Sequence, residues 1–251
     1  MDHSAVLGTP APACFSPWPA HLRGAGLRLA YLGPAGTWTH QACLQWLEEA
    51  GWPPGLESSP ALRAMAAPEA LQALAQGAVD AVCLPVSTRL VGATPYLPLV
   101  LAALAAAHAP PAARPLQVVG ECRLQLGYSL MARAGVTLAQ VQAVCAHPVA
   151  LQEARPWLAQ HLPGLAQRAC DSAGAAAQAV AAADDQALAC LGPALAAALH
   201  GLRVLQGGIE QGPHNETRWW LLAHPAPGDN AVADARQPWL GQRVLAHDAG
   251  T

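Results

Sequence analysis

The sequence predicts an α/β fold with mostly parallel β-strands, and three observations carry this prediction. Short apolar runs of strand length alternate with longer segments that carry helix start and stop signals. Strand-then-helix repetition is typical of parallel sheets with helices on their faces. The composition is globular, with 53% hydrophobic and 12% charged residues, and 251 residues suffice for one sizeable core or for two small lobes.

Local signals place the individual elements. Apolar runs predict strands over 27–32, 79–86, 141–145, 187–191 and 218–222, with an extended segment over 118–131. Helices are predicted over 39–50, 68–76, 148–161 and 172–183, with a further helix beginning at Pro193. Pro68 and Pro148 stand at first helical positions and Ser172 is a favoured N-cap residue, so these three helix starts are the best defined.

Both ends of the sequence are expected to be tails. Residues 1–26 contain four prolines and no clear period, and residues 225–251 are irregular and polar. The ordered domain is therefore expected over 27–224.

Charge excludes several classes of partner and chemistry. The net charge is −3, so no basic face for nucleic acid is expected. All 13 basic residues are arginine. Without lysine, the chain cannot form a Schiff base with pyridoxal phosphate, and it cannot supply the lysine of a phosphate-binding P-loop.

The cysteines and the apolar runs bear on location. The seven cysteines include no CxxC pair and mostly sit in apolar runs, which indicates small buried side chains in a reducing compartment. The longest apolar run, 97–107, is well short of the roughly 20 residues that a membrane span needs. The N-terminus lacks a basic start followed by a hydrophobic stretch, so we expect a cytoplasmic protein with no membrane partner.

Polar clusters follow several of the expected strands. They occupy 33–37, 85–92, 146–148 and 171–172. Ligands of open α/β sheets bind beyond the carboxyl ends of the strands, so these clusters predict a binding cleft.

Three of these positions also have plain structural interpretations. Gly36 and Thr37 could present backbone N–H groups to an anion, or they could form a tight strand-to-helix turn. His147 could face a ligand or cap the helix that follows it. An N-cap role accounts for Ser172 without any ligand, although its hydroxyl could also contact a carboxylate.

The segment 215–219, Asn-Glu-Thr-Arg-Trp, carries the most reactive combination. The guanidinium of Arg218 is the side-chain group best suited to bind a carboxylate through two parallel hydrogen bonds. The Thr217 hydroxyl beside it could donate a proton to a leaving group. Threonine and arginine are also common on surfaces, so this segment alone does not define a site.

Taken in order, these clusters resemble the prephenate dehydratase family over nearly the whole of 27–224. The family begins with a strand followed by Gly-Pro-x-Gly-Thr-aromatic-Ser/Thr-His, which 31–40 matches. Its later landmarks are Pro-Ile-Glu-Asn-Ser-x-x-Gly, Gly-Glu, Ser-His-Pro-Gln-Ala-Leu, Ser-Thr-x-x-Ala and Asn-x-Thr-Arg-Phe. They correspond in whole or part to 85–92, 120–121, 146–151, 172–176 and 215–219.

The resemblance implies a fold of two α/β lobes with a cleft between them, similar to periplasmic binding proteins, with the second lobe at about 114–201. It implies conversion of prephenate to phenylpyruvate, water and carbon dioxide, in phenylalanine biosynthesis, with no metal and no cofactor. Thr217 takes the place of the family's catalytic threonine. The expected substrate-binding residues are Thr37, Arg89, His147, Ser172, Asn215 and Arg218.

The expected partner is a small dicarboxylate such as prephenate, and the family allows a homodimer. The family's usual phenylalanine-binding ACT domain and its chorismate mutase helices have no counterpart in the sequence. We therefore expect no feedback control through an ACT domain.

Departures from the family pattern leave three functions open. The family's Glu-Asn-Ser is Ser87-Thr88-Arg89 here, a family histidine is Tyr128, and the final phenylalanine is Trp219. The chain could be an unregulated dehydratase, a non-aromatising prephenate decarboxylase, or a non-catalytic binder of small carboxylates. Retention of Thr217 favours the first over the second, while loss of Glu-Asn-Ser favours the third. Arg89 could supply a carboxylate contact under all three.

Overall fold

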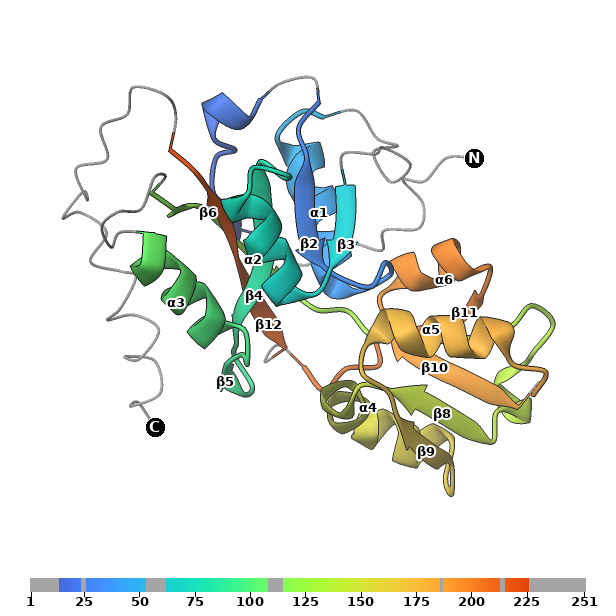
Figure 1. Ribbon diagram of the computed structural model, residues 1–251. Coiled ribbons are helices and arrows are strands. Elements are labelled where there is room, and N and C mark those ends of the chain that lie inside the picture. The colour runs from blue at the N-terminus through green and yellow to red at the C-terminus, as the bar shows by residue number, and fades with distance from the viewer. Residues whose placement is uncertain are drawn as a thin grey trace. The chain divides into compact units, whose positions relative to one another are not determined.

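The computed structural model describes residues 14–23, 26–52, 62–107, 115–185, 187–212 and 215–225. These residues divide into two compact units, and each is described by itself (Figure 1). Unit 1 holds the described residues of 33–45 and 124–216, and unit 2 holds those of 14–32, 46–123 and 217–251. The chain passes between the units within α1 (Trp38–Glu49), β6 (Gln117–Gln125) and β12 (Glu216–Ala223), and after β2 (Leu29–Leu32).

Unit 1 contains a five-stranded sheet in the order β11-β7-β10-β8-β9. Its strands are β7 (Ser129–Ala132), β8 (Ala143–Ala146), β9 (Ala166–Ala169), β10 (Leu188–Gly192) and β11 (Arg203–Gly207). Its other elements are α4 (Pro148–His161), α5 (Ala173–Ala182), α6 (Ala194–His200) and the 3-10 turn η4 (Leu138–Gln140). The pairs β10–β8 and β8–β9 are parallel, as the strand-helix alternation predicts, whereas β7 and β11 are antiparallel neighbours.

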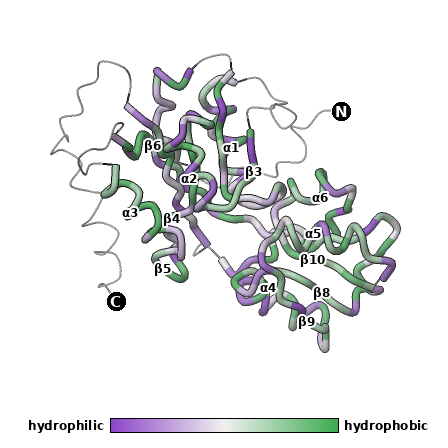
Figure 2. The backbone as a smooth tube through the Cα atoms, in the orientation of Figure 1, coloured by the Kyte–Doolittle hydropathy of each residue, from purple (hydrophilic) through white to green (hydrophobic). Residues whose placement is uncertain are grey.

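Small side chains fill the core of unit 1. Figure 1 shows α5 and α6 on one side of this sheet and α4 on the other. The buried side chains of α5 and α6 are mostly alanine, and they pack against Met131, Cys145 and Cys190 of the sheet. Every residue of β8 and β10 is buried, and Figure 2 shows both strands as largely hydrophobic. Burial on both faces explains why these strands are continuous apolar runs in the sequence.

Unit 2 contains a seven-stranded sheet in the order β1-β6-β12-β4-β2-β3, with β5 paired to β4. Besides β2, β6 and β12, its strands are β1 (Cys14–Phe15), β3 (Leu62–Met65), β4 (Ala81–Thr88) and β5 (Gly92–Ala93). Its helices are α2 (Ala67–Ala75) and α3 (Leu97–Ala107), with the 3-10 turn η2 (Ala20–Leu22). The three strands at one end of the sheet, β4, β2 and the edge strand β3, are parallel, and β12 runs antiparallel to β4.

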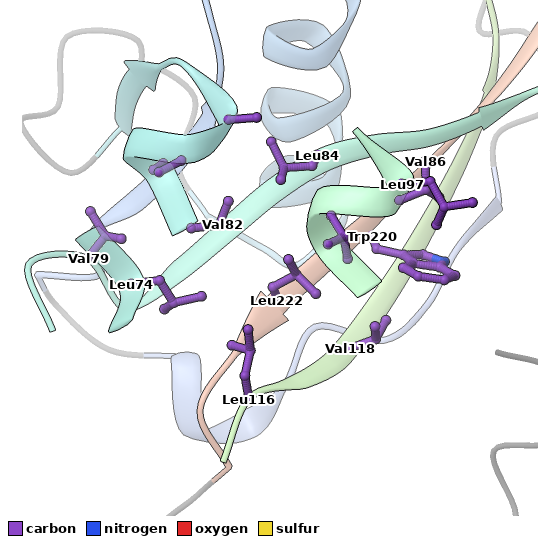
Figure 3. Close-up of a cluster of buried hydrophobic side chains, with 14 residues drawn as sticks. Leu74, Val79, Val82, Leu84, Val86, Leu97, Leu116, Val118, Trp220 and Leu222 are labelled. Carbon is purple, nitrogen blue, oxygen red and sulfur yellow. The ribbon is translucent and has the colours of Figure 1, made fainter. Parts of the chain in front are cut away.

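The core of unit 2 joins strands that are far apart in the sequence. Leu84 of β4, Val118 of β6 and Trp220 of β12 belong to one buried cluster with Leu74 of α2 and Leu97 of α3 (Figure 3). Trp220 is fully buried. Burying side chains of this size stabilises a fold by about 1.5–3 kcal/mol each, so this cluster fixes where β12 lies in the sheet.

Two boundaries differ from the sequence prediction. Residues 14–23, which were assigned to the N-terminal tail, belong to unit 2: β1 pairs with β6, and Trp18 is 4% exposed with its ring edge-on to Trp46. The second lobe was expected at about 114–201, whereas unit 1 includes 33–45 and extends from 124 to 216. The remainder of both expected tails, 1–13 and 226–251, lies outside the described residues.

Candidate functional site

In unit 1, the candidate residues gather at the carboxyl edge of the sheet. Ala146 at the end of β8 pairs with Ala169 at the end of β9, so His147 and the segment 170–172 leave the sheet side by side. Each then begins a helix: His147 precedes α4, and Ser172 precedes α5. The amino termini of these two helices are electropositive, which favours an anionic ligand at this edge.

The loop between β2 and α1 packs on the first turns of α5 and α6. A Cβ atom on Gly174 of α5 would overlap the carbonyl oxygen of Ala35, so only glycine allows this approach. Gly36 has φ +78, and a Cβ on it would lie 3.3 Å from Ala196 of α6. Thr37, which follows in the loop, is thereby held at the carboxyl edge of the unit 1 sheet.

The loop uses its polar groups internally. The Gly36 N–H donates to Nδ1 of His40 at 3.2 Å, and the Thr37 Oγ1 accepts the His40 N–H at 3.3 Å, capping α1. Burial lowers the pKa of His40 to about 4, so this ring stays neutral and accepts a hydrogen bond at neutral pH. The sequence alone does not decide whether this loop presents backbone N–H groups to an anion. The Gly36 N–H donates its hydrogen bond to His40 and is therefore not available to an anion.

His147 and Ser172 both act as helix caps. His147 Nδ1 accepts the Val149 N–H at 3.3 Å, and burial lowers the pKa of His147 while nearby Asp171 opposes this shift. A neutral ring that accepts at Nδ1 carries its proton on Nε2, which can therefore donate to a ligand. Ser172 Oγ accepts the Ala175 N–H at 3.1 Å, and its hydroxyl hydrogen remains able to donate.

Asn215 is anchored beside the start of β7. Asn215 is 4% exposed. Its side-chain Nδ2 donates to the Leu126 carbonyl, and its backbone carbonyl accepts the Leu126 N–H at 3.0 Å. Trp38 holds the same segment, because its Nε1 donates to the Gly127 carbonyl at 3.3 Å. The buried Oδ1 of Asn215 has no hydrogen-bond partner among the described residues, which leaves an acceptor for a ligand hydroxyl or amide.

Tyr128 lies on the same stretch of chain as a buried neutral phenol. Its ring is 2% exposed and lies 4.6 Å from the ring of Trp38, centroid to centroid. Burial raises the pKa of Tyr128, and the charges of Glu153 and Glu210 raise it further. The side chain therefore cannot serve as a base at neutral pH.

In unit 2, Thr217 and Arg218 begin β12 opposite the end of β4. Thr217 is 5% exposed and pairs with Thr88, while Arg218 pairs with Ser87. Arg218 Nε lies 3.7 Å from Glu121 Oε1, and both side chains are mostly buried. The guanidinium of Arg218 is therefore positioned by an acidic neighbour that the sequence analysis did not assign to the site.

Glu121 organises this corner of unit 2. Besides its ion pair with Arg218, it accepts hydrogen bonds from Arg123 Nε at 2.7 Å and from Trp220 Nε1 at 3.3 Å. Gly120 before it carries no side chain because a Cβ there would lie 2.7 Å from the Trp46 ring. The Gly-Glu landmark thus combines a packing requirement with a carboxylate that holds the start of β12.

The predicted site residues therefore form two groups. Unit 1 holds Thr37, His147, Ser172 and Asn215 around one sheet edge, and unit 2 holds Arg89, Thr217 and Arg218. Arg89 is exposed in the turn between β4 and β5, three residues after Val86, the last buried position of β4, whereas Arg218 is mostly buried. His214, which precedes this motif, lies outside the described residues.

The described residues contain no group of three or more His, Cys, Asp or Glu side chains placed to hold a metal ion. In the same part of the chain, no helix has both the length and the apolar character that crossing a membrane requires.

Comparison with known proteins places this arrangement in a family. The family model for prephenate dehydratase matches residues 29–227. A prephenate dehydratase of Mycolicibacterium gilvum is 36% identical over 203 residues, covering 79% of this chain and 62% of that protein. The crystal structure of a prephenate dehydratase from Arthrobacter aurescens, in complex with L-Phe, is 27% identical with a TM-score of 0.65, covering 80% of this chain and 61% of that one.

A structure described as a quorum-quenching acylase is 24% identical with a TM-score of 0.62, covering 79% of this chain and 64% of that one, and shows a shared fold alone. The fold and the site define an α/β protein of two units in which polar side chains gather at a sheet edge. The chain belongs to the prephenate dehydratase family. It spans about 62% of the length of the M. gilvum relative.

Proposed function

We propose that the chain is a prephenate dehydratase, which converts prephenate to phenylpyruvate, carbon dioxide and water. The observation that carries the proposal is the Asn215-x-Thr217-Arg218 motif, retained at the start of β12 in a member of this family. Thr217 is buried, and Arg218 is held by Glu121, so both side chains occupy fixed positions. Fixed positions are what a reaction that depends on orientation requires.

The chemistry of prephenate suits these residues. The substrate carries two carboxylates and a ring hydroxyl. In the proposed reaction, the ring carboxylate leaves as carbon dioxide, its electron pair enters the ring, and the hydroxyl departs as water after accepting a proton. Thr217 donates the hydrogen bond, and finally the proton, to that hydroxyl. A neutral threonine is a weak acid, so it acts mainly by positioning, and aromatisation drives the rest.

The remaining polar groups bind carboxylates in this proposal. Arg218 supplies a guanidinium, and exposed Arg89 supplies a second one. In unit 1, Ser172 and the Nε2 of His147 supply hydrogen-bond donors at two helix amino termini. The proposed reaction needs neither a metal nor an organic cofactor.

The test is a product assay with prephenate. Purified protein is expected to produce phenylpyruvate, and Thr217→Ala is expected to lower kcat by about 100-fold or more, the usual effect of losing a positioned acid. Thr217→Ser retains a hydroxyl and serves as the matched control, with most of the activity kept. Carbon dioxide with a non-aromatic keto acid would instead identify the decarboxylase. Neither product, with thermal stabilisation by prephenate, would identify a carboxylate binder.

Location and assembly complete the proposal. We place the enzyme in the cytoplasm, supported by the six described cysteines, which form no disulfide. We propose a homodimer, supported by the exposed leucines Leu99 and Leu101 on α3, which give a second copy an apolar surface. Sedimentation velocity would test the dimer.

A further inference from the structure

Three cysteines gather in the core of unit 1. Cys145 of β8 stands directly opposite Cys190 of β10 in a parallel pair. Cys170, which follows β9, packs against the buried cluster that contains both of them. Cys145 and Cys190 are buried, whereas Cys170 is partly exposed. Cys170 is therefore the one of these three that a dissolved oxidant can reach.

Strand register brings the side chain of Cys170 to that of Cys145. Cys145 is opposite Arg168 of β9, and Cys170 is two residues further along. The Cys170 N–H donates to the Ala146 carbonyl at 2.9 Å, so the ladder continues to this residue. Residues two apart on a strand project to the same face, and here α5 covers that face. The two thiols lie within hydrogen-bonding distance of each other.

A disulfide between Cys145 and Cys170 requires the segment after β9 to move. Adjacent strands are about 4.8 Å apart and two residues rise about 6.6 Å, which puts the Cα atoms of such diagonal neighbours about 8 Å apart. Disulfides span about 4.4–6.8 Å between Cα atoms, so the two residues must approach by at least about 1 Å. Cys145 is held in place, because every residue of β8 is buried and its Sγ donates to the Ala176 carbonyl of α5 at 3.6 Å. The movement therefore falls on the exposed strand β9 and on 170–172.

This movement acts on the start of α5. Ser172 follows Cys170 by two residues, and its Oγ accepts the Ala175 N–H at 3.1 Å as the helix N-cap. A further separation of about 1 Å takes this pair beyond hydrogen-bonding distance. Drawing Cys170 toward Cys145 therefore removes the cap.

We infer that Cys170 and Cys145 are a redox pair, in which a peroxide oxidises Cys170 and Cys145 then closes a disulfide that pulls Ser172 away from α5. In the first step, the Cys170 sulfur attacks hydrogen peroxide: an S–O bond forms, the O–O bond breaks, and the second oxygen leaves as water. In the second step, Cys145 attacks the sulfenic sulfur of Cys170: an S–S bond forms, the S–O bond breaks, and the hydroxyl leaves as water with the Cys145 proton. Together the two thiols lose two electrons and two protons, and the peroxide is reduced to two waters.

Burial makes the second step slow. It raises the pKa of the Cys145 thiol to about 12, so little of the attacking thiolate is present at neutral pH. Closure of the disulfide is therefore expected to take minutes to hours rather than seconds.

Thiol mapping by mass spectrometry tests the pair. The reduced chain is incubated overnight with hydrogen peroxide, alkylated with iodoacetamide in urea and digested with trypsin, which cuts after Arg168 and so separates Cys145 from Cys170. The two peptides are expected to be joined, with a mass lower by two hydrogens than their sum, and dithiothreitol should release them. Cys170→Ser should abolish the link and leave Cys145 alkylated.

Cys190 shares the tryptic peptide of Cys170, and Cys190→Ala is the matched control. This variant should retain the link, because Cys190 takes no part in it. A link that survives in Cys170→Ser would join Cys145 to Cys190 and overturn the inference. A sulfenic or sulfinic acid at Cys170 beside an alkylated Cys145 would also overturn it, as would alkylation of all three thiols.

Amide hydrogen exchange tests the displacement of Ser172. In the oxidised protein, the Ala175 N–H is expected to exchange about 2- to 30-fold faster than in the reduced protein, the factor that loss of an N-cap implies. The Val149 N–H, which His147 caps at the start of α4, is the internal control and should keep its rate. An unchanged rate at Ala175 in a chain that carries the disulfide would overturn the inference.

The redox pair goes beyond the proposed function, and only its effect on prephenate binding, through Ser172, rests on that function. Thiol mapping and amide exchange use no substrate. A chain that fails to convert prephenate would therefore refute the proposed function and leave the redox pair to be decided by these two measurements.

Discussion

The replacement Gly120→Ala tests how closely the landmark glycine before Glu121 is packed. In a strand interior, this change should by itself stabilise the protein by about 0.4–1 kcal/mol, because it reduces the conformational freedom of the unfolded chain. The structure predicts the opposite sign. A Cβ at this position would lie 2.7 Å and 2.9 Å from two carbons of the Trp46 ring and 2.9 Å from Ser16 Oγ. These distances are almost 1 Å shorter than ordinary contacts between such atoms.

Neither neighbour can move away easily. Trp46 is 1% exposed and donates through Nε1 to the Ser16 carbonyl at 3.0 Å, while Ser16 Oγ accepts the Glu121 N–H at 2.8 Å. Overpacking a core costs about 1–3 kcal/mol. After the backbone gain is subtracted, we expect a net loss of about 1–2 kcal/mol, or a Tm lower by about 3–6 °C for a protein of this size.

Thermal and urea unfolding, followed by circular dichroism, measure this loss. Gly127→Ala is the matched control, because a Cβ there meets nothing within 4 Å, and it should be neutral or slightly stabilising. Combining Gly120→Ala with Trp46→Leu should make the glycine replacement far less costly than it is alone. A Gly120→Ala protein that is as stable as the original chain would refute the packing argument.

Two further predictions concern groups in unit 1. Because the pKa of His40 is lowered from 6.5 to about 4, the unfolded chain takes up a proton first as pH falls, and stability is lost between pH 6.5 and 4. The free energy of unfolding should drop by about 2 kcal/mol from pH 7 to pH 5, and His40→Asn should flatten this dependence; an equally steep slope in the variant would count against it. Ser172→Ala should cost about 1 kcal/mol of stability through loss of the N-cap, while Ser172→Asp should keep the cap. If Ser172 also meets a substrate carboxylate, the aspartate variant should remain stable yet show a KM raised about tenfold or more by charge repulsion, so an unchanged KM would limit Ser172 to capping.

The sequence by itself determined the elements whose signals are local. The helix 148–161 was predicted with the bounds it has, and the predicted N-cap at Ser172 holds α5 as expected. Proline at a first helical position and serine at an N-cap act through neighbours within four residues, so no tertiary contact is needed to interpret them. The buried strands β8 and β10 were equally readable, because burial on both faces makes them continuous apolar runs.

The strands at the edges of the unit 1 sheet could not be predicted from apolar runs in the sequence. All four residues of β9 are exposed, and β11 is exposed at four of its five positions. Such strands exist because a neighbouring strand offers its backbone groups, and their side chains carry no apolar pattern to report this. The assignment of Trp18 to a tail failed for a related reason, since only its packing against Trp46 makes that segment part of unit 2.

The candidate site shows the same division. Motif order pointed to Thr217, Arg218 and Ser172, because each stands in a short recognisable segment. Only the tertiary structure placed Thr88 opposite Thr217 and Glu121 beside Arg218. The register of β12 against β4, and the hydrogen bond from Trp220 of β12 to Glu121 of β6, bring together residues that are about 100 positions or more apart in the sequence. No local sequence pattern encodes such a pairing. The sequence thus determined which residue types are available for the chemistry, and the register of β4 and β12 decided which of them lie next to one another.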